Sequence, residues 1–347
     1  MRFLAIEHQL PSAKVSNAEV FDRLREQSGR HLSGPQVEQL LALTKACFDS
    51  TGTTVRYHRA PGEEPYALAR MAGERALATA GLKPEDIDLL IYVGIGRGIV
   101  EPASANIYQD ILGLRNATCF DIVDACASWL RAMHVSSTFL RVGAYKRIMI
   151  LNAEFVGRDC HRYELKSLSE FAHWHPSVTI GEASTATIVE SSSEPNDFVV
   201  NFRTWGEKRD LCFVPMSNFA GYFGKDVGFE VKPMQFVSFG LRLMDFGAEK
   251  LIEHYRSSAE FNSFEPDLVF GHSASDGMAA HIVKSCGLEP SKYEFSHRDF
   301  ANTISASVPL AMSHSIKAGR LKPSQRVLIL FASAGVTTAL AKFQYLN

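Results

Sequence analysis

The sequence predicts an α/β fold assembled from two similar halves, and three observations lead to this prediction. Apolar, strand-like runs alternate with amphipathic helical stretches along the 347 residues. A polar, turn-rich stretch, Ser191–Asp197 (SSSEPND), separates two parts of the chain. The parts also resemble each other, since FDIVDACASWLRAMHVSSTFLRVGAYKRIMIL in the first has a partner in the second, RDFANTISASVPLAMSHSIKAGRLKPSQRVLIL. We therefore expect one half over residues 1–194 and the other over 195–347, each bringing one small-residue helix to a shared centre.

Buried strands are predicted where apolar runs of strand length are bounded by turn residues. They are Ile87–Val93, Arg147–Asn152, Val178–Val189, Asp267–Phe270 and Arg326–Phe331. Helices are predicted where apolar residues recur at helical spacing. They are Pro65–Ala80, Ser104–Leu112, Cys126–Val142, Phe236–Arg256, Asp276–Cys286 and Asn302–Ala318.

Composition argues against several classes of protein. Apolar residues make up 46% and charged residues 21% of the chain, and the net charge is −2, with the two signs interspersed. This balance does not favour binding to nucleic acid or to an anionic membrane. The N-terminal stretch is too short and too polar for a signal peptide or a membrane span. The six cysteines form no C-x-x-C pair, so we expect reduced thiols in a cytoplasmic protein without membrane insertion.

Three residues stand where an α/β fold places chemistry. Cys126 follows an apolar run and opens a predicted helix, where the helix dipole favours a thiolate, although a buried structural cysteine fits the local sequence equally well. His272 follows a predicted strand through Gly271, at the strand end where ligands bind, although a surface-loop histidine is a sufficient alternative. Asn302 opens the second small-residue helix, where an N-cap role would also explain it. The internal repeat places Cys126 and Asn302 at equivalent helix starts that point into one centre.

Other patterns carry weaker signals. The glycines at 94, 96 and 98 follow a strand, but their spacing does not match a dinucleotide-binding loop. The histidines at 161, 173 and 175, near Cys160, lack a compact metal-ligand spacing, so a solvated loop is the favoured interpretation. Glu154 and Arg158 follow a strand and could line the mouth of a site or form structural ion pairs. We expect neither a metal nor a bound cofactor.

Four blocks together resemble a known family. FDIVDACASWL, DLVFGHSAS, FANTISASVPLAM and AGRLKPSQRVLILFASAG are similar, in order and spacing, to the signature blocks of β-ketoacyl-acyl-carrier-protein synthase III. The resemblance begins at HQLPSAKVSNAEV and covers nearly the whole chain. It implies a thiolase fold with five α-β-α-β-α layers in two pseudo-symmetric halves, and a homodimer. It also implies acyl thioesters of a carrier-protein phosphopantetheine or of coenzyme A as substrates.

The resemblance assigns roles to the residues singled out above. Cys126 would carry the acyl group, and His272 and Asn302 would donate hydrogen bonds to the second thioester as its enolate develops. The backbone N–H groups of Cys126 and of the turn formed by Ser333, Ala334 and Gly335 would bind the oxygen of the acyl group. Ser275, three residues after His272, is predicted to contact substrate.

The sequence departs from this family at several points. The family's Gly-rich turn is Phe331–Gly335 (FASAG) here, with one glycine. The Trp and Arg that sandwich the adenine of coenzyme A map near Ala46 and Ser50, which favours a carrier-protein donor. Residues Gly29–Phe48 look like a helical insertion that could enlarge an acyl tunnel.

Glu101 precedes Pro102 in GIVEPAS, where the family usually places an apolar residue that reaches the partner subunit's acyl pocket. An E-P pair here resembles the olefin-biosynthesis thiolases, in which the glutamate removes an α-proton without decarboxylation. In an apolar pocket such a carboxyl would have a raised pKa suited to a general base. An exposed loop glutamate in a turn before proline is the alternative.

The favoured function is a Claisen condensation between two acyl thioesters, through an acyl-cysteine intermediate. Acyl transfer to an alcohol or amine is the first alternative, but proteins of that kind tend to alter the asparagine, which is intact as Asn302. A catalytically inactive partner subunit is the second alternative. The intact Cys126, His272 and Asn302 argue against it.

Overall fold

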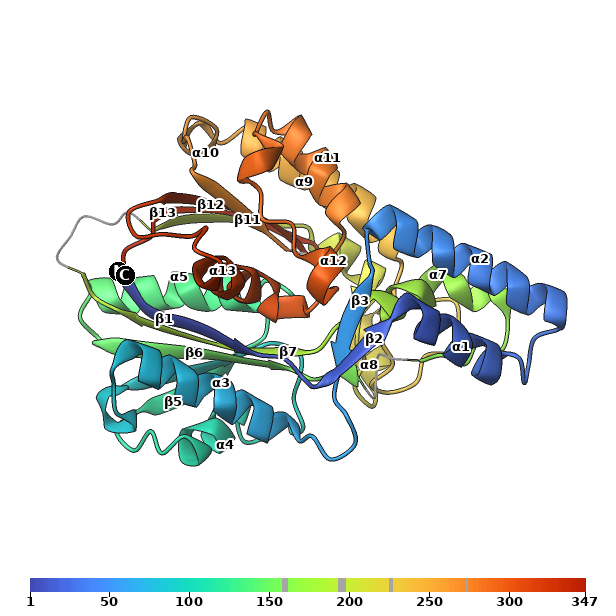
Figure 1. Ribbon diagram of the computed structural model, residues 1–347, viewed down its shortest axis with the longest axis horizontal. Coiled ribbons are helices and arrows are strands. Elements are labelled where there is room, and N and C mark those ends of the chain that lie inside the picture. Colours follow the sequence, from blue (N-terminus) through green and yellow to red (C-terminus); the bar gives the residue numbers. More distant parts are fainter. Residues whose placement is uncertain (158–161, 193–197, 225–226, 273) are drawn as a thin grey trace.

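The computed structural model describes residues 1–157, 162–192, 198–224, 227–272 and 274–347. The two large β-sheets alternate with three sets of helices in five layers (Figure 1). Helices α3 (Pro65–Ala80) and α4 (Ser104–Ile111) cover the outer face of the first sheet, and α9 (Gly240–Arg256) and α11 (Asp276–Ser285) cover the outer face of the second. Helices α5 (Ser128–Arg141) and α13 (Ser307–Lys317) fill the layer between the sheets. The predicted five-layered α/β class is confirmed.

The first sheet has five strands in the order β1-β7-β6-β4-β5. Its strands are β1 (Arg2–Gln9), β4 (Leu89–Val93), β5 (Thr118–Ile122), β6 (Arg147–Glu154) and β7 (Ala183–Glu190). Strand β4 runs parallel to both β5 and β6, whereas β7 is antiparallel to both β6 and β1. The parallel strands therefore deliver their carboxyl ends to one edge, which is where α/β folds bind ligands.

The second sheet repeats this arrangement with four strands in the order β11-β12-β13-β8. Its strands are β8 (Val199–Thr204), β11 (Leu268–Gly271), β12 (Arg326–Ser333) and β13 (Thr337–Gln344). Strands β11 and β12 are parallel, and β13 is antiparallel to both of its neighbours. The first sheet has β5 next to β4 at its edge. At the corresponding edge of the second sheet, the described residues form a single parallel bridge, between Val269 of β11 and Tyr293. The two halves therefore share strand order and direction, while the boundary predicted between 194 and 195 lies outside the described residues.

The core between the sheets is made by α5 and α13. Trp129 on α5 is 1% exposed and donates its indole N–H to Thr187 on β7 at 3.1 Å. Leu130, Met133, Val308 and Met312 from the same two helices are fully buried beside it. Truncating a buried Trp of this kind costs about 3–5 kcal/mol, because both apolar contact and a filled volume are lost. This layer therefore fixes the positions of the loops that enter α5 and α13.

Several element boundaries differ from the sequence prediction. Residues 178–179 belong to a 3-10 turn, His175–Thr179, and the strand begins only at Ala183. Phe236 precedes a short strand, β10 (Val237–Ser238), which pairs with β9 (Cys212–Phe213), so α9 begins at Gly240. Helix α5 begins two residues after Cys126, and α13 begins five residues after Asn302. Neither residue is therefore the first residue of its helix.

A helical arm extends from the layered body (Figure 1). It contains α1 (Asn17–Ser28) and α2 (Gly34–Thr51) next to the hairpin of β2 (Ala13–Ser16) and β3 (Val55–His58). Ser16 caps α1 reciprocally with Glu19, which satisfies two backbone N–H groups at the helix start. Leu24, Leu40 and Phe48 are buried in a separate apolar core of the arm. Further short helices among the described residues are α7 (Phe171–Trp174), α8 (Phe219–Phe223), α10 (Ala259–Asn262) and α12 (His297–Phe300).

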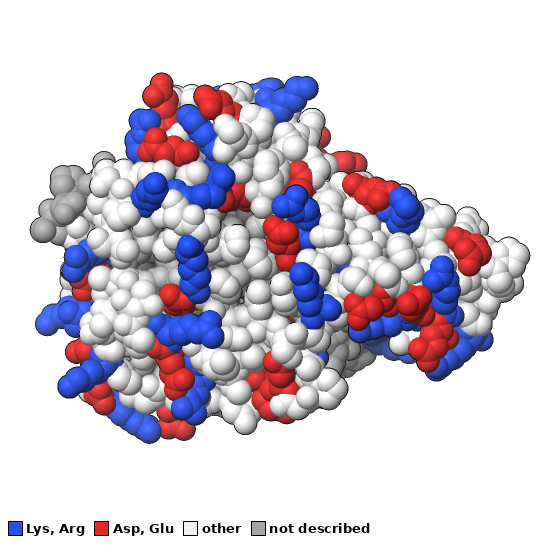
Figure 2. All heavy atoms as spheres, in the orientation of Figure 1, with Lys and Arg blue, Asp and Glu red and all other residues white. Residues whose placement is uncertain are grey.

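The surface carries both charge signs in close alternation. In the face shown in Figure 2, Lys and Arg side chains lie beside Asp and Glu over both the body and the arm. Many of them pair along a single helix, as Lys45 does with Asp49 at 2.6 Å. In the described part of the chain, no helix combines the length and apolar character that crossing a bilayer requires.

Candidate active site

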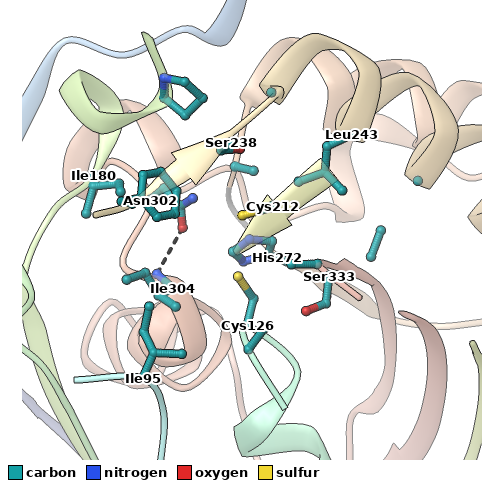
Figure 3. Close-up of a pocket in the computed structure, with 18 of the residues that line it drawn as sticks. Ile95, Cys126, Ile180, Cys212, Ser238, Leu243, His272, Asn302, Ile304 and Ser333 are labelled. Carbon is teal, nitrogen blue, oxygen red and sulfur yellow. Dashed lines mark hydrogen bonds between the residues drawn. The ribbon is translucent and has the colours of Figure 1, made fainter. Parts of the chain in front are cut away.

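A cavity of about 910 Å³ lies between the two halves, and most of the predicted site residues line it. The lining includes Cys126, His272, Asn302, Ser275, Ser333 and Ala334. Figure 3 shows Cys126 and His272 facing each other, with Asn302 on one side and Ser333 on the other. Two predicted residues, Glu101 and Gly335, are not part of this lining. The cavity therefore brings together residues that are far apart in sequence and come from both halves.

Cys126 is presented by a sharp turn between β5 and α5. Ala125 has a positive φ of 46°, which L-residues rarely adopt, and the Ala127 N–H donates to the Asp124 carbonyl at 2.9 Å. The Asp124 carboxylate accepts a hydrogen bond from Arg131 of α5 at 2.9 Å. The turn is thereby tied to the helix that follows it. This geometry directs the Cys126 thiol into the cavity rather than into the core.

The surroundings of Cys126 oppose the thiolate that the helix dipole was expected to favour. Burial raises the pKa of Cys126 well above its usual range, and the nearby Cys212 and Glu154 raise it further. Hydrogen bonds from the Ser333 side chain and the Ala334 backbone lower the pKa, but burial dominates. The helix begins only at Ser128, so its dipole acts on the sulfur from two residues away. Nucleophilic attack therefore requires a base that takes the thiol proton.

His272 brings a buried imidazole into the cavity opposite Cys126. Burial, assisted by the charge of His297, lowers the pKa of His272 from 6.5 to about 3. Its ring stacks on Phe331 with centroids 5.3 Å apart, which fixes the ring plane. The imidazole therefore stays uncharged at neutral pH and keeps a nitrogen lone pair available.

Ser307 controls which nitrogen of His272 carries the proton. Its Oγ lies 2.8 Å from His272 Nδ1 and donates to the Ile304 carbonyl at 2.9 Å. A serine hydroxyl has one proton, so when Ile304 receives it, Ser307 accepts the Nδ1–H of His272 and Nε2 keeps its lone pair. If the hydroxyl turns toward Nδ1, the proton of His272 moves to Nε2 and makes it a donor. Sequence reasoning missed Ser307, although it stands in the same N-T-I-S-A-S block as Asn302.

Asn302 is held by its backbone and by its side chain. Its N–H donates to the Thr179 carbonyl at 2.9 Å, and its carbonyl accepts from Gly181 at 3.0 Å. Its Oδ1 accepts the Ile304 N–H at 2.9 Å, the bond drawn in Figure 3. The amide oxygen is thus occupied, which leaves the Nδ2–H₂ group as a donor toward the cavity. The alternative role as the N-cap of α13 is wrong, since that helix begins at Ser307 with Ala306 as its cap.

The turn after β12 closes the cavity beside Cys126. Ser333 pairs with Thr337 at the end of the β12–β13 hairpin, and Gly335 has a φ of 129°, a conformation that favours glycine. The Ser333 side chain is 5% exposed, and its hydroxyl has no oxygen or nitrogen partner among the described residues. The retained glycine thus provides the turn, while Ser333 and Ala334 face the thiol.

Ser275 has a structural role at the start of α11. Its hydroxyl accepts the Met278 N–H at 3.1 Å and caps the helix. Ser275 also lines the cavity, so its predicted contact with substrate stays a prediction.

Glu101 lies on the exposed loop between β4 and α4, outside the cavity of its own chain. Val100 and Val123 beside this loop are 64% and 56% exposed, yet both line the cavity. The cavity wall is therefore apolar but open to solvent at this edge. The role of Glu101 as a base stays a prediction and, if correct, requires the residue to act on another subunit.

Glu154 is fully buried beneath the site and does not line its mouth. It accepts hydrogen bonds from the Gly96 N–H at 2.9 Å and from the side chain of Ser305, which in turn accepts from Asn152 at 2.8 Å. Burial raises the pKa of Glu154, and these donors oppose that effect. The carboxyl joins the loop after β4 to the turn that follows Asn302. Arg158, which was predicted together with Glu154 to line the mouth of a site or to form an ion pair, lies outside the described residues.

The glycines after β4 make room for this carboxyl. A Cβ at Gly94 would come within 2.3 Å of Glu154 Oε1, and one at Gly96 within 2.2 Å of the Ala153 carbonyl oxygen. Close approach to protein atoms therefore explains these two glycines without a nucleotide.

The histidine-rich stretch also has a structural explanation. His175 is buried, bonds the Phe171 carbonyl at 3.0 Å and lines the cavity, so a solvated loop is the wrong interpretation for it. His173 stacks on Phe229. Cys160 and His161 lie outside the described residues, and the described ones include no His, Cys, Asp and Glu group arranged to hold a metal ion.

Helix α2 contributes to the cavity wall through Cys47 and Thr51. Ala46 and Ser50, which the sequence comparison above placed near the family's adenine contacts, are exposed on the same helix. No aromatic ring or guanidinium therefore stands at these two positions to hold an adenine.

Comparison with known families identifies two matching segments. A profile described as 3-oxoacyl-[acyl-carrier-protein (ACP)] synthase III matches residues 120–206, and its C-terminal counterpart matches residues 257–345. Together they span just over half of the chain. The first contains Cys126, and the second contains His272 and Asn302.

Relatives and solved structures agree with these profiles. The β-ketoacyl-[acyl-carrier-protein] synthase III of Clostridium perfringens is 27% identical over 79% of this chain and 82% of its own, and that of Clostridium acetobutylicum is 25% identical over 78% and 81%. Xanthomonas campestris OleA, solved with a cysteine replaced by alanine, superposes with a TM-score of 0.83 at 20% identity, covering 99% of this chain and 96% of its own. The corresponding synthase III of Aquifex aeolicus gives 0.80 at 20% identity, covering 99% of each chain. The chain belongs to the 3-oxoacyl-acyl-carrier-protein synthase III family, the condensing acyltransferases of the thiolase fold.

Proposed function

We propose that this enzyme joins two acyl thioesters through an acyl group carried on Cys126. The observation that supports this most is the meeting of a buried thiol, a neutral imidazole and an oriented amide donor in one cavity. The cavity is lined mainly by apolar side chains, which suits an acyl chain and excludes water from the acyl-enzyme.

In the first half-reaction, the Cys126 sulfur attacks the carbonyl carbon of the donor thioester. His272 Nε2 takes the thiol proton, and the Ala334 N–H and the Ser333 hydroxyl stabilise the oxyanion. The carbon–sulfur bond of the donor then breaks. The leaving thiolate recovers the proton from Nε2, which leaves a neutral imidazole and an acyl-Cys126.

In the second half-reaction, the α-carbon of another acyl thioester becomes a carbanion and attacks the acyl-Cys126 carbonyl. The Asn302 amide donates to the enolate oxygen, and His272 donates as well when Nε2 carries the proton. The new carbon–carbon bond forms as the Cys126 thiolate leaves. The carbanion arises either by loss of carbon dioxide from a malonyl-type or β-ketoacyl donor or by proton removal from a simple acyl thioester.

Glu101 is the base for proton removal in the second version, supplied across a homodimer interface. The exposed Val100 and Val123 at the open edge of the cavity are suited to burial by a second copy of the chain. Strand β5, at the edge of the first sheet, lies next to them and offers unpaired backbone groups to a partner. A carboxyl delivered there would meet an apolar cavity rather than water.

The carrier of the acyl groups is an acyl carrier protein, coenzyme A or both, and the enzyme works in the cytoplasm without a bound cofactor. The names of the sequence relatives include the acyl carrier protein, and one OleA structure was solved with lauric acid and lauroyl-CoA. The exposed Ala46 and Ser50 offer no adenine contact, which favours the carrier protein.

Product analysis with matched substrates tests the reaction class. Wild-type enzyme is given simple acyl thioesters alone, or acyl thioesters with a malonyl-type donor, and products are identified by mass. Condensation predicts a β-ketoacyl product, whereas an acyl ester or amide would support transfer to an alcohol or amine instead. Glu101→Ala should abolish products from simple acyl thioesters, while Glu85→Ala, an exposed glutamate elsewhere, should not.

Mixing two inactive homodimers tests whether Glu101 acts across the interface. A heterodimer of Cys126→Ala and Glu101→Ala chains contains one complete site only if the cysteine and the glutamate come from different subunits. Recovery of activity after subunit exchange supports the proposal. Absence of recovery, with heterodimers verified by native mass spectrometry, contradicts it.

A further inference from the structure

Arg97 carries the only permanent charge among the described residues that line the cavity. The other lining side chains are apolar or uncharged, and they include the buried His175 and His272, whose pKa values are lowered by burial. A guanidinium is cationic at neutral pH and has hydrogen-bond donors but no acceptors. Because charges interact more strongly where water is excluded, a single cation in this lining favours a substrate group with a negative charge.

The carboxylate next to Arg97 is engaged elsewhere. Arg97 Nη2 lies 3.4 Å from Asp121 Oδ2 without forming a hydrogen bond, and the guanidinium donates to no other described residue. The two Asp121 oxygens accept the backbone N–H groups of Ser104 and Ala105 at the start of α4, at 2.8 Å each. Asp121 therefore offsets part of the charge of Arg97 but leaves its donors unused. The Arg97 side chain is 22% exposed, so these donors remain accessible to a ligand.

The backbone places Arg97 beside the nucleophile. Strands β4 and β5 are parallel neighbours, and Val93 at the end of β4 pairs with Ile122 at the end of β5. Arg97 and Cys126 each follow four residues after one of these paired residues, at the same edge of the sheet. Ile95 and Cys126 also pack against the same small apolar cluster, and Figure 3 shows both on one side of the cavity. The Arg97 loop therefore lies next to the acyl group on Cys126.

The loop is fixed directly before Arg97. Gly96 donates its N–H to Glu154 at 2.9 Å, and its carbonyl accepts the Tyr92 hydroxyl. Tyr92 and Glu154 are both buried. An arginine on a backbone held in this way loses little backbone freedom when it binds a ligand. Its planar guanidinium can also bind both oxygens of a carboxylate at once.

We propose that Arg97 binds a carboxylate at the free end of the acyl group carried on Cys126, so that the enzyme takes acyl groups derived from dicarboxylic acids. The methylene groups of such a chain contact the apolar lining, and the carboxylate pairs with the guanidinium. A carboxylate that leaves as carbon dioxide fits less well, because an ion pair stabilises it before it leaves and so slows its loss. This inference rests on the proposed acyl-Cys126 chemistry and adds a substrate class to it.

Matched acyl groups test this preference. Glutaryl, adipyl and pimeloyl thioesters of pantetheine are each compared with the acyl group in which a carboxamide replaces the free carboxylate, which keeps the shape and removes the charge. The rate of acyl-Cys126 formation is followed by intact-protein mass spectrometry. In wild type, at least one of the carboxylates should react about 10-fold faster than its carboxamide.

Substitutions of Arg97 test whether this residue is the cause. Arg97→Gln should slow acylation by the preferred carboxylate about 10- to 100-fold and change the rate with its carboxamide less than about two-fold. The carboxamide thereby reports whether the variant is folded. Arg97→Lys keeps a point charge and should keep part of the preference. Arg115→Gln removes an exposed arginine that pairs with Asp110 at 3.0 Å, and it should match wild type.

The outcomes separate the inference from the chemistry on which it rests. Equal rates with carboxylates and carboxamides in wild type, or an equal loss with both in Arg97→Gln, would overturn the inference while leaving acyl-Cys126 intact. An effect of Arg97→Gln confined to malonyl-type donors in the second half-reaction would overturn it as well. A preference that appears only in Glu101→Ala would also overturn it, since that glutamate would then neutralise Arg97 in the wild-type dimer. The absence of any adduct on Cys126, with every acyl group, would instead overturn the proposed function.

Discussion

The two halves share a scaffold but deliver different chemistry to the cavity. Both have the same order and direction of four strands, and both send a helix into the central layer. In each, an alanine with positive φ precedes the functional residue, with 46° at Ala125 before Cys126 and 58° at Ala301 before Asn302. The first half thereby presents a nucleophile, and the second presents a hydrogen-bond donor.

The difference lies in how each loop is held. The Cys126 turn is short and is tied to its own helix through Asp124 and Arg131. Asn302 stands five residues before its helix and is fixed by contacts to the first half, through Thr179 and Gly181 and through the Glu154–Ser305 bond. Duplication thus placed two equivalent loops at one centre, and different anchoring allowed them to take different roles.

The largest expected effect comes from removing the donor of the second half. Asn302→Ala should reduce carbon–carbon bond formation by about 10²–10³-fold, because one oxyanion donor is lost. Acylation of Cys126 should continue at close to the wild-type rate. Single-turnover mass spectrometry for acylation and product analysis for condensation separate the two steps. Equal loss of both would mean that Asn302 also serves acylation, contrary to its proposed role in the second half-reaction alone.

Removing the link between the halves should have the next largest effect. Glu154→Ala leaves the N–H groups of Gly96 and Ser305 without their acceptor in a buried site, so it should lower the free energy of unfolding by about 3 kcal/mol. Glu154→Gln keeps the shape and should cost less. Urea denaturation measures both, with Glu164→Ala on the surface as the control. An unchanged midpoint in Glu154→Ala would show that the link is dispensable.

Ser307→Ala tests the control of the His272 proton. Without the hydroxyl, the Nδ1–H of His272 loses its acceptor, so Nε2 is no longer held as a base. Acylation should slow about 10-fold, and its pH profile should shift, because the protonation state of the base changes. Ser307→Thr, which keeps the hydroxyl, should restore much of the rate. A slower rate with an unaltered pH profile in Ser307→Ala would indicate a structural role only.

The least localised effect is a pH dependence of stability shared by both halves. Burial lowers the pKa of His8 and His58 in the first half, and of His254 in the second, from 6.5 to about 4. The unfolded chain takes up protons below pH 6.5, while these folded sites do not until about pH 4. The free energy of unfolding should therefore fall as the pH is lowered between these values. Thermal unfolding across this range checks it, and a midpoint that rises on acidification would contradict it.

Much of the architecture could be predicted because it follows from local patterns. The apolar runs located β4, β6, β11 and β12, and the repeat predicted two halves that meet at a centre. The start of β7 was placed too early, because Val178 and Thr179 are β-branched, as strand residues often are, but belong to a 3-10 turn that holds Asn302. A prediction from the spacing of apolar residues cannot include a hydrogen bond between residues as distant in sequence as Asn302 and Thr179.

The sequence motifs located the polar residues that line the cavity, but not the pKa shifts that burial gives them. Cys126, His272 and Asn302 were identified from motifs and line one cavity, whereas burial in that cavity opposes the thiolate expected for Cys126. The roles of Ser307 and Glu154 depend on His272 and on Ser305, which are distant from them in sequence, so no local pattern could assign those roles. Glu101 lies on the exposed edge, and its role depends on a second subunit.

The central claim is that Cys126 is the acyl-carrying nucleophile and that the cysteine beside it, Cys212, is not. The most direct test is peptide mapping after a single turnover with an isotopically labelled acyl thioester. We predict label on the peptide containing Cys126 in wild type, in Asn302→Ala and in Cys212→Ala, and none in Cys126→Ala. Label on Cys212, or an adduct that survives in Cys126→Ala, would contradict the account.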